Sequence, residues 1–170
     1  MRKALWVLVI VALFTVSAPV ASAQGIDDIK KHPVCKFCNM DRQQYAHSRF
    51  LTEYDDGTSF GACSIHCAAV DVALNIDKTP RSYQVGDYNT KQLINAESAT
   101  WVIGGSKPGV MTKRAKWAFE KKADAEQFVK QNGGEVGTFE QAMKASFDDM
   151  YSDTKSINEK RKAKRTQPTQ

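Results

Sequence analysis

Polar and apolar residues alternate along residues 48–54 (SRFLTEY), which is the pattern of a half-buried strand. The dipeptide Asp56-Gly57 follows, and it favours a tight hairpin turn because both residues accept positive φ angles. Residues 58–62 are therefore predicted to return as the partner strand. A helix over residues 65–75, with apolar residues at helical spacing, and a further strand over residues 81–88 complete this first unit.

The second half of the chain repeats this order of elements. Residues 100–103 are apolar and rich in strand-forming types, and a glycine-containing loop follows them. Residues 116–119 are predicted to form the returning strand. Residues 122–132 are predicted to form a helix, which Gly133 ends. A last helix is expected directly after Thr138, where apolar residues again recur at helical spacing.

The recurring order of strand, turn, strand and helix predicts an α+β fold. We expect two small, related ββαβ-like units, over about residues 32–90 and 95–150, followed by a C-terminal helix. Only the first unit contains cysteines, so a site built on thiols belongs to that unit. Residues 24–154 form the expected folded region, and the basic residues 155–170 are predicted to be a disordered tail.

The formal net charge of +5 belongs to the two ends of the chain. Residues 1–23 carry two bases and no acid, and residues 155–170 carry six bases and one acid. The region between them has a net charge of −2. A body that would grip the phosphates of a nucleic acid needs a basic surface, so no nucleic-acid partner is expected.

Residues 1–23 have the layout of a secretory signal peptide. Arg2 and Lys3 precede an apolar run over residues 5–16, and Ala21-Ser22-Ala23 supplies small residues for cleavage after about Ala23. The run is shorter than the roughly 20 residues of a membrane span. No cysteine follows it, so there is no lipobox for a lipid anchor. We expect an exported, periplasmic protein without a stable membrane anchor, and an uncleaved N-terminal anchor is the alternative.

Four cysteines occur as two close pairs. Cys35 and Cys38 are separated by two residues, 24 residues follow, and Cys63 and Cys67 are separated by three. Exported cysteines normally form disulfides, but a bridge within either pair would close a very short loop and gain little stability. The spacing therefore favours a metal site. The sequence leaves open whether Cys63 and Cys67 are ligands, a disulfide or part of a zinc knuckle.

Three further residues extend this candidate metal site. Met40 lies two residues beyond Cys38, His66 lies within the second cysteine pair, and Met111 follows the glycine loop. Thiolate and thioether ligands suit Cu(I), whereas four thiolates, or three with an imidazole, suit Zn(II). Adjacent residues on a helix point in different directions, so His66 need not share a metal with Cys67. Cu(I) is the preferred ion and Zn(II) the alternative.

Residues 34–40 (VCKFCNM) resemble the C-x-x-C-G/N-M signature of the NosL family, the copper-binding accessory proteins of nitrous-oxide reductase. Further similarities follow in order along the chain, over about residues 32–143. They are Asp56-Gly57 with Phe60-x-x-Cys63-Ser64, then Gly109-Val110-Met111, then Ala118-Phe119 with residues 123–128 and Gly133-Gly134. The group of Cys63, His66 and Cys67 is fuller than the family pattern, and it resembles related treble-clef motifs that sense metals.

The resemblance implies an exported Cu(I) carrier that delivers copper to the cluster of a periplasmic reductase. It marks Cys35, Cys38, Met40 and Met111 as the copper residues. The predicted function is that of a metallochaperone and not of an enzyme: Cu(I) passes by ligand exchange from a copper donor to a copper-receiving periplasmic protein. Two alternatives remain, a thiol–disulfide oxidoreductase that uses Cys35 and Cys38, and an interaction module held by structural zinc.

Overall fold

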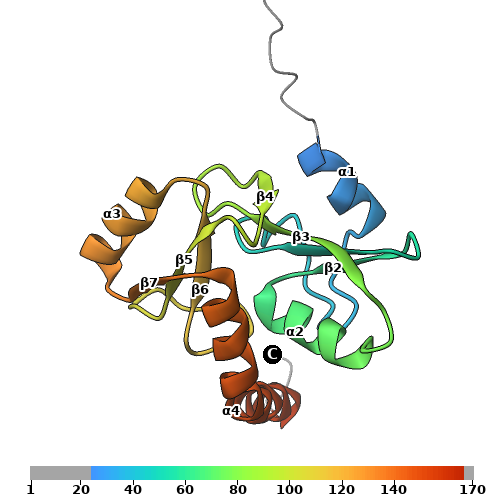
Figure 1. Ribbon diagram of the computed structural model, residues 1–170. Coiled ribbons are helices and arrows are strands. Elements are labelled where there is room, and N and C mark those ends of the chain that lie inside the picture. The colour runs from blue at the N-terminus through green and yellow to red at the C-terminus, as the bar shows by residue number, and fades with distance from the viewer. Residues whose placement is uncertain (1–23, 167–170) are drawn as a thin grey trace, which may run out of the picture.

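The computed structural model of the 170-residue chain describes residues 24–166 (Figure 1). The predicted signal peptide and its cleavage point lie outside the described residues. The described part begins with helix α1 (Gln24–Lys31), where the sequence indicated only a polar lead-in. Asp28, in the middle of this helix, is buried, so α1 is packed against the folded body.

The first unit contains one four-stranded antiparallel sheet in the order β2-β1-β3-β4. Phe50 in the central strand pairs with Ala62 on one side and with Val85 on the other. The elements are β1 (Phe50–Tyr54), β2 (Ser59–Ala62), α2 (Ile65–Leu74), β3 (Pro80–Gly86) and β4 (Leu93–Asn95). The expected strand–turn–strand–helix–strand order is confirmed. Strand β4 was not predicted, because a strand of three residues is too short to show an alternating pattern.

The second unit repeats this arrangement with a three-stranded antiparallel sheet in the order β6-β5-β7. Its elements are β5 (Thr100–Ile103), β6 (Lys116–Phe119), α3 (Lys122–Asn132) and β7 (Glu135–Gly137). In both sheets the first strand is central, the second flanks it on one side, and the strand that follows the helix flanks it on the other. The two predicted ββαβ-like units are therefore confirmed.

The residues that directly follow β3 make contacts between the two sheets. The backbone N–H of Tyr88 donates to the carbonyl of Ala118 in β6 at 2.8 Å, and the carboxylate of Asp87 accepts the N–H of Glu120, also at 2.8 Å. The Tyr88 ring packs edge-on to Phe128 of α3, with ring centroids 4.9 Å apart. One continuous hydrophobic core therefore includes residues of both units.

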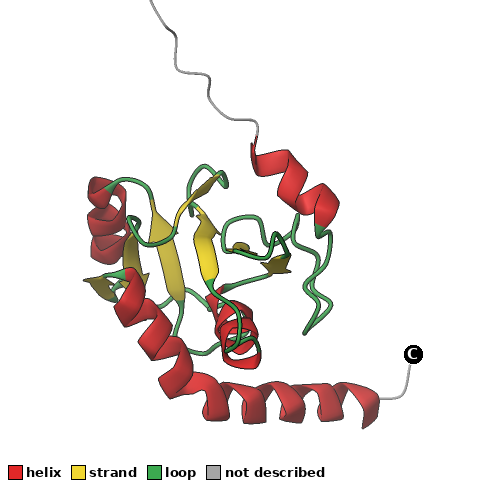
Figure 2. Cartoon of the chain, turned by 45° about the vertical axis from the view of Figure 1, so that its right-hand side comes forward, coloured by secondary structure: helices red, strands yellow, loops and turns green. Residues whose placement is uncertain are grey.

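Helix α4 (Phe139–Thr166) corrects the prediction of a disordered tail, because residues 155–166 continue the helix. These residues are mostly Lys, Arg, Glu and Ala, which favour helix, and Pro168 is the first breaker after them. Ser156 and Ile157 are half-buried, so this part of α4 packs against the body. Figure 2 shows α4 descending from the second sheet and then running beneath the first unit.

Within residues 24–166, none of the helices combines the length and the apolar character that crossing a membrane requires.

Candidate metal centre

Cys35 and Cys38 lie on a tight turn between α1 and β1. The N–H of Cys35 donates to the carbonyl of Met40 at 2.9 Å, and the N–H of Asn39 donates to the carbonyl of Cys35 at 2.7 Å. Asn39 has a φ of 60°, a left-handed conformation that asparagine tolerates better than most residues. The turn therefore fixes the two cysteines on one small loop.

Cys63 and Cys67 lie where β2 passes into α2. Cys63 directly follows the strand, Ser64 occupies the N-cap position with extended backbone, and Cys67 is in the first turn of the helix. The hydroxyl of Ser48 donates to the Cys63 carbonyl at 2.9 Å. This second pair is therefore held by the sheet, by the helix and by a hydrogen bond from the loop before β1.

Arg42 connects the two cysteine-bearing segments. Arg42 lies two residues beyond Met40 in the sequence, and its side chain is fully buried. Its Nε donates to the carbonyl of Ala62 at 3.0 Å, immediately before Cys63, and Nη2 donates to the carbonyl of Phe50 at 3.1 Å. These hydrogen bonds attach the turn that contains Cys35 and Cys38 to the β1–β2 hairpin, which Cys63 directly follows.

Asp28 of α1 balances the charge of this buried guanidinium. Its Oδ2 lies 2.7 Å from Arg42 Nη2 and 3.0 Å from Nε of Arg49, and all three side chains are at most 2% exposed. Arg42 Nη1 also donates to the backbone carbonyls of Asp28 and His32. Sequence reasoning missed this network, because three isolated charges in polar segments give no signal of mutual contact.

The four cysteine sulfurs come together in one group. All four Sγ atoms lie within 4.8 Å of one another. Cys38 Sγ is 3.4 Å from that of Cys63 and 3.9 Å from that of Cys67, and the Cys63 and Cys67 Sγ atoms are 3.7 Å apart. A tetrahedron of sulfurs at 2.3 Å from a central ion has edges of about 3.8 Å. The group therefore has the size of a metal-thiolate centre.

All four cysteines are free thiols, because the closest sulfurs are far beyond the roughly 2.05 Å of a disulfide bond. Cys35, Cys63 and Cys67 are buried, and Cys38 is partly exposed. A ligand-exchange reaction that begins at the surface would therefore begin at Cys38.

The thiols do not all ionise together. Hydrogen bonds from Cys38, Cys63 and Cys67 lower the pKa of Cys35. The pKa of Cys63 and that of Cys67 are raised, first by their hydrogen bonds to Cys35 and Cys38 and also by burial. Four thiolates at these separations would repel one another strongly, so full deprotonation requires a bound cation in their midst.

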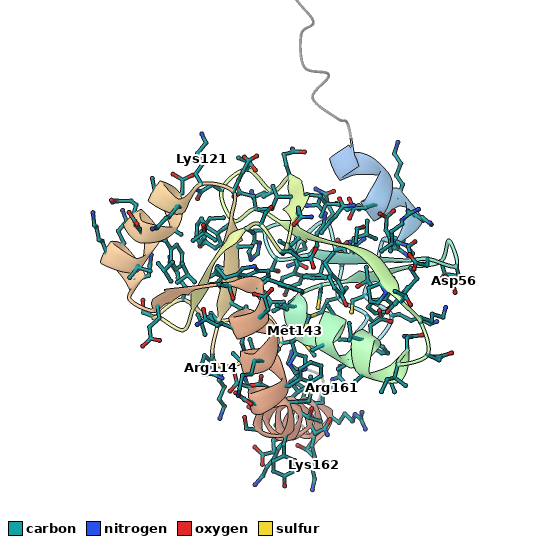
Figure 3. The ribbon with its side chains drawn as sticks, in the orientation of Figure 1. Asp56, Arg114, Lys121, Met143, Arg161 and Lys162 are labelled. Carbon is teal, nitrogen blue, oxygen red and sulfur yellow. The ribbon has the colours of Figure 1, made fainter. Side chains whose placement is uncertain are left out.

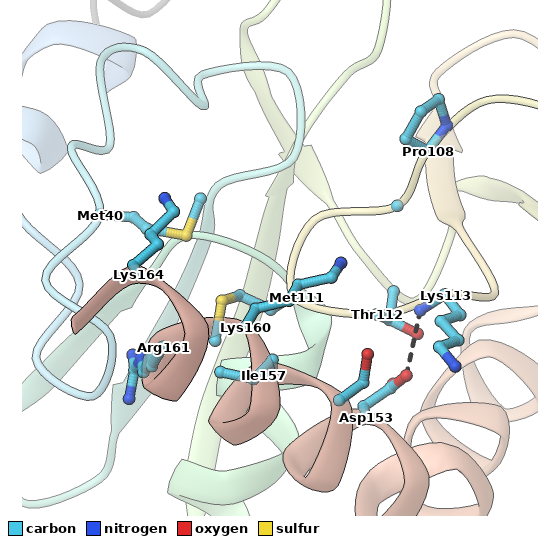
Figure 4. Close-up of a pocket in the computed structure, with 12 residues that line it drawn as sticks. Met40, Pro108, Met111, Thr112, Lys113, Asp153, Ile157, Lys160, Arg161 and Lys164 are labelled. Carbon is cyan, nitrogen blue, oxygen red and sulfur yellow. Dashed lines mark hydrogen bonds between the residues drawn. The ribbon is translucent and has the colours of Figure 1, made fainter. Parts of the chain in front are cut away.

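Met40 and Met111 lie beside the thiol turn, along a hollow of about 560 Å³ (Figure 4). Both methionines are partly buried against the hydrophobic core. Met111 has a φ of 61°, which is unusual for a residue with a side chain, so the loop after the glycines holds it in a strained conformation. The structure thus places the two thioethers in one hollow, which residues of α4 close from the other side.

His66 is placed apart from the sulfur group. Its ring is buried, and its Nδ1 lies 3.5 Å from Oδ2 of Asp153 in α4. The compact group of candidate ligand atoms consists of the four cysteines and does not include this imidazole. Burial lowers the pKa of His66, so the ring is predominantly neutral near pH 7. In this structure His66 of α2 faces Asp153 of α4, without a hydrogen bond between the two side chains.

Gly61 provides a test of the connection through Arg42. A Cβ at this position would clash with Cβ of His32 and would lie 2.8 Å from Cζ of Arg42. We expect Gly61→Ala to displace the buried guanidinium and to lower the free energy of unfolding by about 1–3 kcal/mol, as overpacking does. Urea unfolding measures this change. Gly57→Ala is the control. Gly57 has a φ of 79° and open space around it, so a Cβ there strains the backbone but meets no side chain.

The fold and the sulfur group define a small α+β protein with a four-cysteine centre of a size that can hold a metal ion. The family profile of NosL matches residues 26–147, and the chain belongs to the NosL family. The crystal structure of the copper chaperone NosL from Shewanella denitrificans has a similar fold, with a TM-score of 0.52 and 22% sequence identity. The match covers 63% of this chain and 87% of that chain. None of the curated proteins matches this chain.

Proposed function

We propose that this protein is an exported Cu(I) metallochaperone. The observation that carries the proposal is the group of four free Sγ atoms within 4.8 Å of one another. Membership of the NosL family and the similar fold of a copper chaperone support copper as the cargo.

The chemistry of the donors favours Cu(I). Thiolates and thioethers are soft ligands, which bind Cu(I) in preference to the hard cations of an exported compartment. Met40 and Met111 place two thioethers in the hollow next to the cysteine turn. Cys35, Cys38, Cys63 and Cys67 are the proposed primary ligands, and the two methionines are the proposed additional donors.

The cargo is proposed to move by ligand exchange. Cys38 is the partly exposed member of the group, so a thiolate or thioether of another protein can reach the ion there. Each step exchanges one sulfur ligand for another and changes no oxidation state. The proposed partners are a copper donor and a copper-receiving periplasmic reductase of the nitrous-oxide type, and no organic substrate is transformed.

Structural zinc is the second candidate. Three of the four cysteines are buried, and the sulfur separations fit tetrahedral Zn(II) as well as Cu(I). The oxidoreductase alternative has less support. Dithiol oxidoreductases carry C-x-x-C at the start of a helix that follows a strand, whereas Cys35 and Cys38 lie on a turn between a helix and a strand.

Substitution of the two methionines distinguishes a Cu(I) site from a Zn(II) site. We expect the reduced wild-type protein to bind about one Cu(I), and we expect Met40→Leu with Met111→Leu to weaken Cu(I) binding by about 10- to 100-fold, the effect of altering groups around a metal site. Zn(II) binding should remain unchanged, because zinc would use the four thiolates alone. Competition titrations with chromophoric chelators under anaerobic conditions measure both affinities.

The swap from Met to Leu conserves volume, so folding should be retained. Met143→Leu, in α4, is the matched control. A wild-type protein that holds one Zn(II) and does not exchange it for Cu(I) would support the structural role and contradict the chaperone proposal.

A further inference from the structure

The C-terminal part of α4 carries an excess of positive charge. Its bases are Lys155, Lys160, Arg161, Lys162, Lys164 and Arg165, and its only acid is Glu159. The ion pairs found among residues 24–166 involve none of these six bases. Lys164 and Arg165 lie in the last turn, where cations also favour the helix C-terminus. None of the six charges is neutralised by an ion pair with a described residue, so this charge is available to another molecule.

The bases divide between two faces of the helix. Lys160, Arg161 and Lys164 line the hollow that contains Met40 and Met111 (Figure 4). Lys155 and Lys162 line a separate surface depression on another face of α4. Figure 3 shows Arg161 and Lys162 near the end of α4, far from Lys121 at the start of α3. The face of α4 that carries Lys160, Arg161 and Lys164 therefore lies beside the two methionines of the proposed copper site.

The surroundings of the hollow add to this charge. Lys113 lines it from the loop before β6, and the acidic residue that lines it is Asp153. Oδ1 of Asp153 accepts the backbone N–H of Lys113 at 3.0 Å, and the Asp153 side chain is 1% exposed. The carboxylate is thus turned inward, and cations dominate the exposed rim.

We propose that Lys113, Lys160, Arg161 and Lys164 form a docking surface for an acidic protein surface on the partner that exchanges copper. The proposal rests on the proposed copper-carrier function. An acidic surface seated on this rim would bring the donor atoms of the partner over the two thioethers. Charge complementarity of this kind raises association rates by 10-fold to 10³-fold and orients the partner.

A protein partner fits this surface better than a lipid surface does. Helices that lie on membranes combine basic residues with Trp, Phe or Leu on an apolar face. Residues 158–166 (NEKRKAKRT) contain Ala163 as their only apolar residue. The last two turns of α4 thus offer charge without an apolar face to insert.

Two charge-reversal variants of the same helix test the proposal. Lys160→Glu with Lys164→Glu changes the rim, and Lys155→Glu with Lys162→Glu makes the same change in net charge on the other face. The probe is a fluorescein-labelled peptide of alternating glutamate and glycine, and its binding to the reduced protein is followed by anisotropy. We expect the rim variant to weaken binding by about tenfold or more at low salt and the control variant to have a much smaller effect.

The contrast between the variants should shrink at about 0.5 M salt, where the screening length is only a few ångströms. Equal losses in both variants, or no loss in either, would overturn the proposal. Binding of the rim face to vesicles of phosphatidylglycerol and phosphatidylcholine, without binding of the peptide, would overturn it in favour of a membrane. The peptide contains no thiol or thioether, which are the ligands that Cu(I) prefers, and its binding is measured without added metal. This result is therefore independent of the Cu(I) titration that tests the copper-carrier function.

Discussion

Cys35→Ser with Cys38→Ser is expected to abolish high-affinity Cu(I) binding. The variant removes two of four sulfurs that lie within 4.8 Å of one another, including the partly exposed thiol of Cys38. Structural zinc sites with four ligands bind with roughly 10–16 kcal/mol, and on that scale loss of half of the ligands should cost about 5 kcal/mol or more. This corresponds to a weakening of more than about a thousandfold. Anaerobic titration against a Cu(I) chelator measures it.

The control for this variant must separate loss of ligands from loss of fold. Cys35 is fully buried, so a serine hydroxyl there is itself destabilising. Cys35→Ala with Cys38→Ala removes the same sulfurs without adding a buried hydroxyl, and both variants should lose copper equally. Circular dichroism of the metal-free proteins reports whether their helix content is that of the wild type. Unchanged Cu(I) affinity in a folded double variant would remove these cysteines from the site.

Asp28→Ala is expected to be the most destabilising single substitution outside the sulfur group. It leaves the buried guanidinium groups of Arg42 and Arg49 without their shared carboxylate. Removing one partner from a buried ion pair costs about 3–5 kcal/mol, which is a large share of the stability of a domain of this size. Because Arg42 also bonds the carbonyl before Cys63, metal affinity should fall together with stability.

A conservative variant and a control accompany Asp28→Ala. Asp28→Asn keeps an oxygen acceptor and should recover part of the loss. Asp148→Ala removes an aspartate from the exposed side of α4, where it forms an ion pair with Lys144. Exposed pairs contribute little, so this control should unfold almost as the wild type does. If Asp28→Ala also unfolded like the wild type, the buried network would not hold α1 to the body.

The regular elements could be predicted because their signals are local. The Asp-Gly turn predicts the first hairpin, and residues 116–119 and 122–132 coincide with β6 and α3. The signal weakens where an element depends on distant contacts. Helix α1 is short and polar, and it is fixed by Asp28 through arginines 14 and 21 residues away. No periodic pattern in residues 24–34 reveals those contacts.

The prediction of a disordered tail was wrong for a related reason. Residues 155–166 are charged and contain few apolar positions, which is also typical of disordered segments. Their helix propensity is nevertheless high, and they extend a helix that is already anchored by Phe139, Ala142 and Asp153. An established helix adds residues without a new nucleation cost, so composition alone does not mark where it ends.

The candidate site was predictable in its residue types more than in its geometry. The spacing of the cysteines indicated a metal centre, and the structure brings the four sulfurs into one group. His66 follows the same sequence signal but faces Asp153, because neighbouring residues on α2 point in different directions. The buried arginine that joins the two cysteine segments left no trace in the sequence pattern.

The two units place different residues at the same point of a matching architecture. In each unit two residues connect the second strand to the helix: Cys63 and Ser64 in the first, Glu120 and Lys121 in the second. Counted from the helix start, the position of Cys67 corresponds to that of Asp124. The strand order around the first strand and the length of this connection are thus the same in both units, while the residues placed there differ. The first unit carries thiols at this point, and the second contributes a scaffold on which α4 begins.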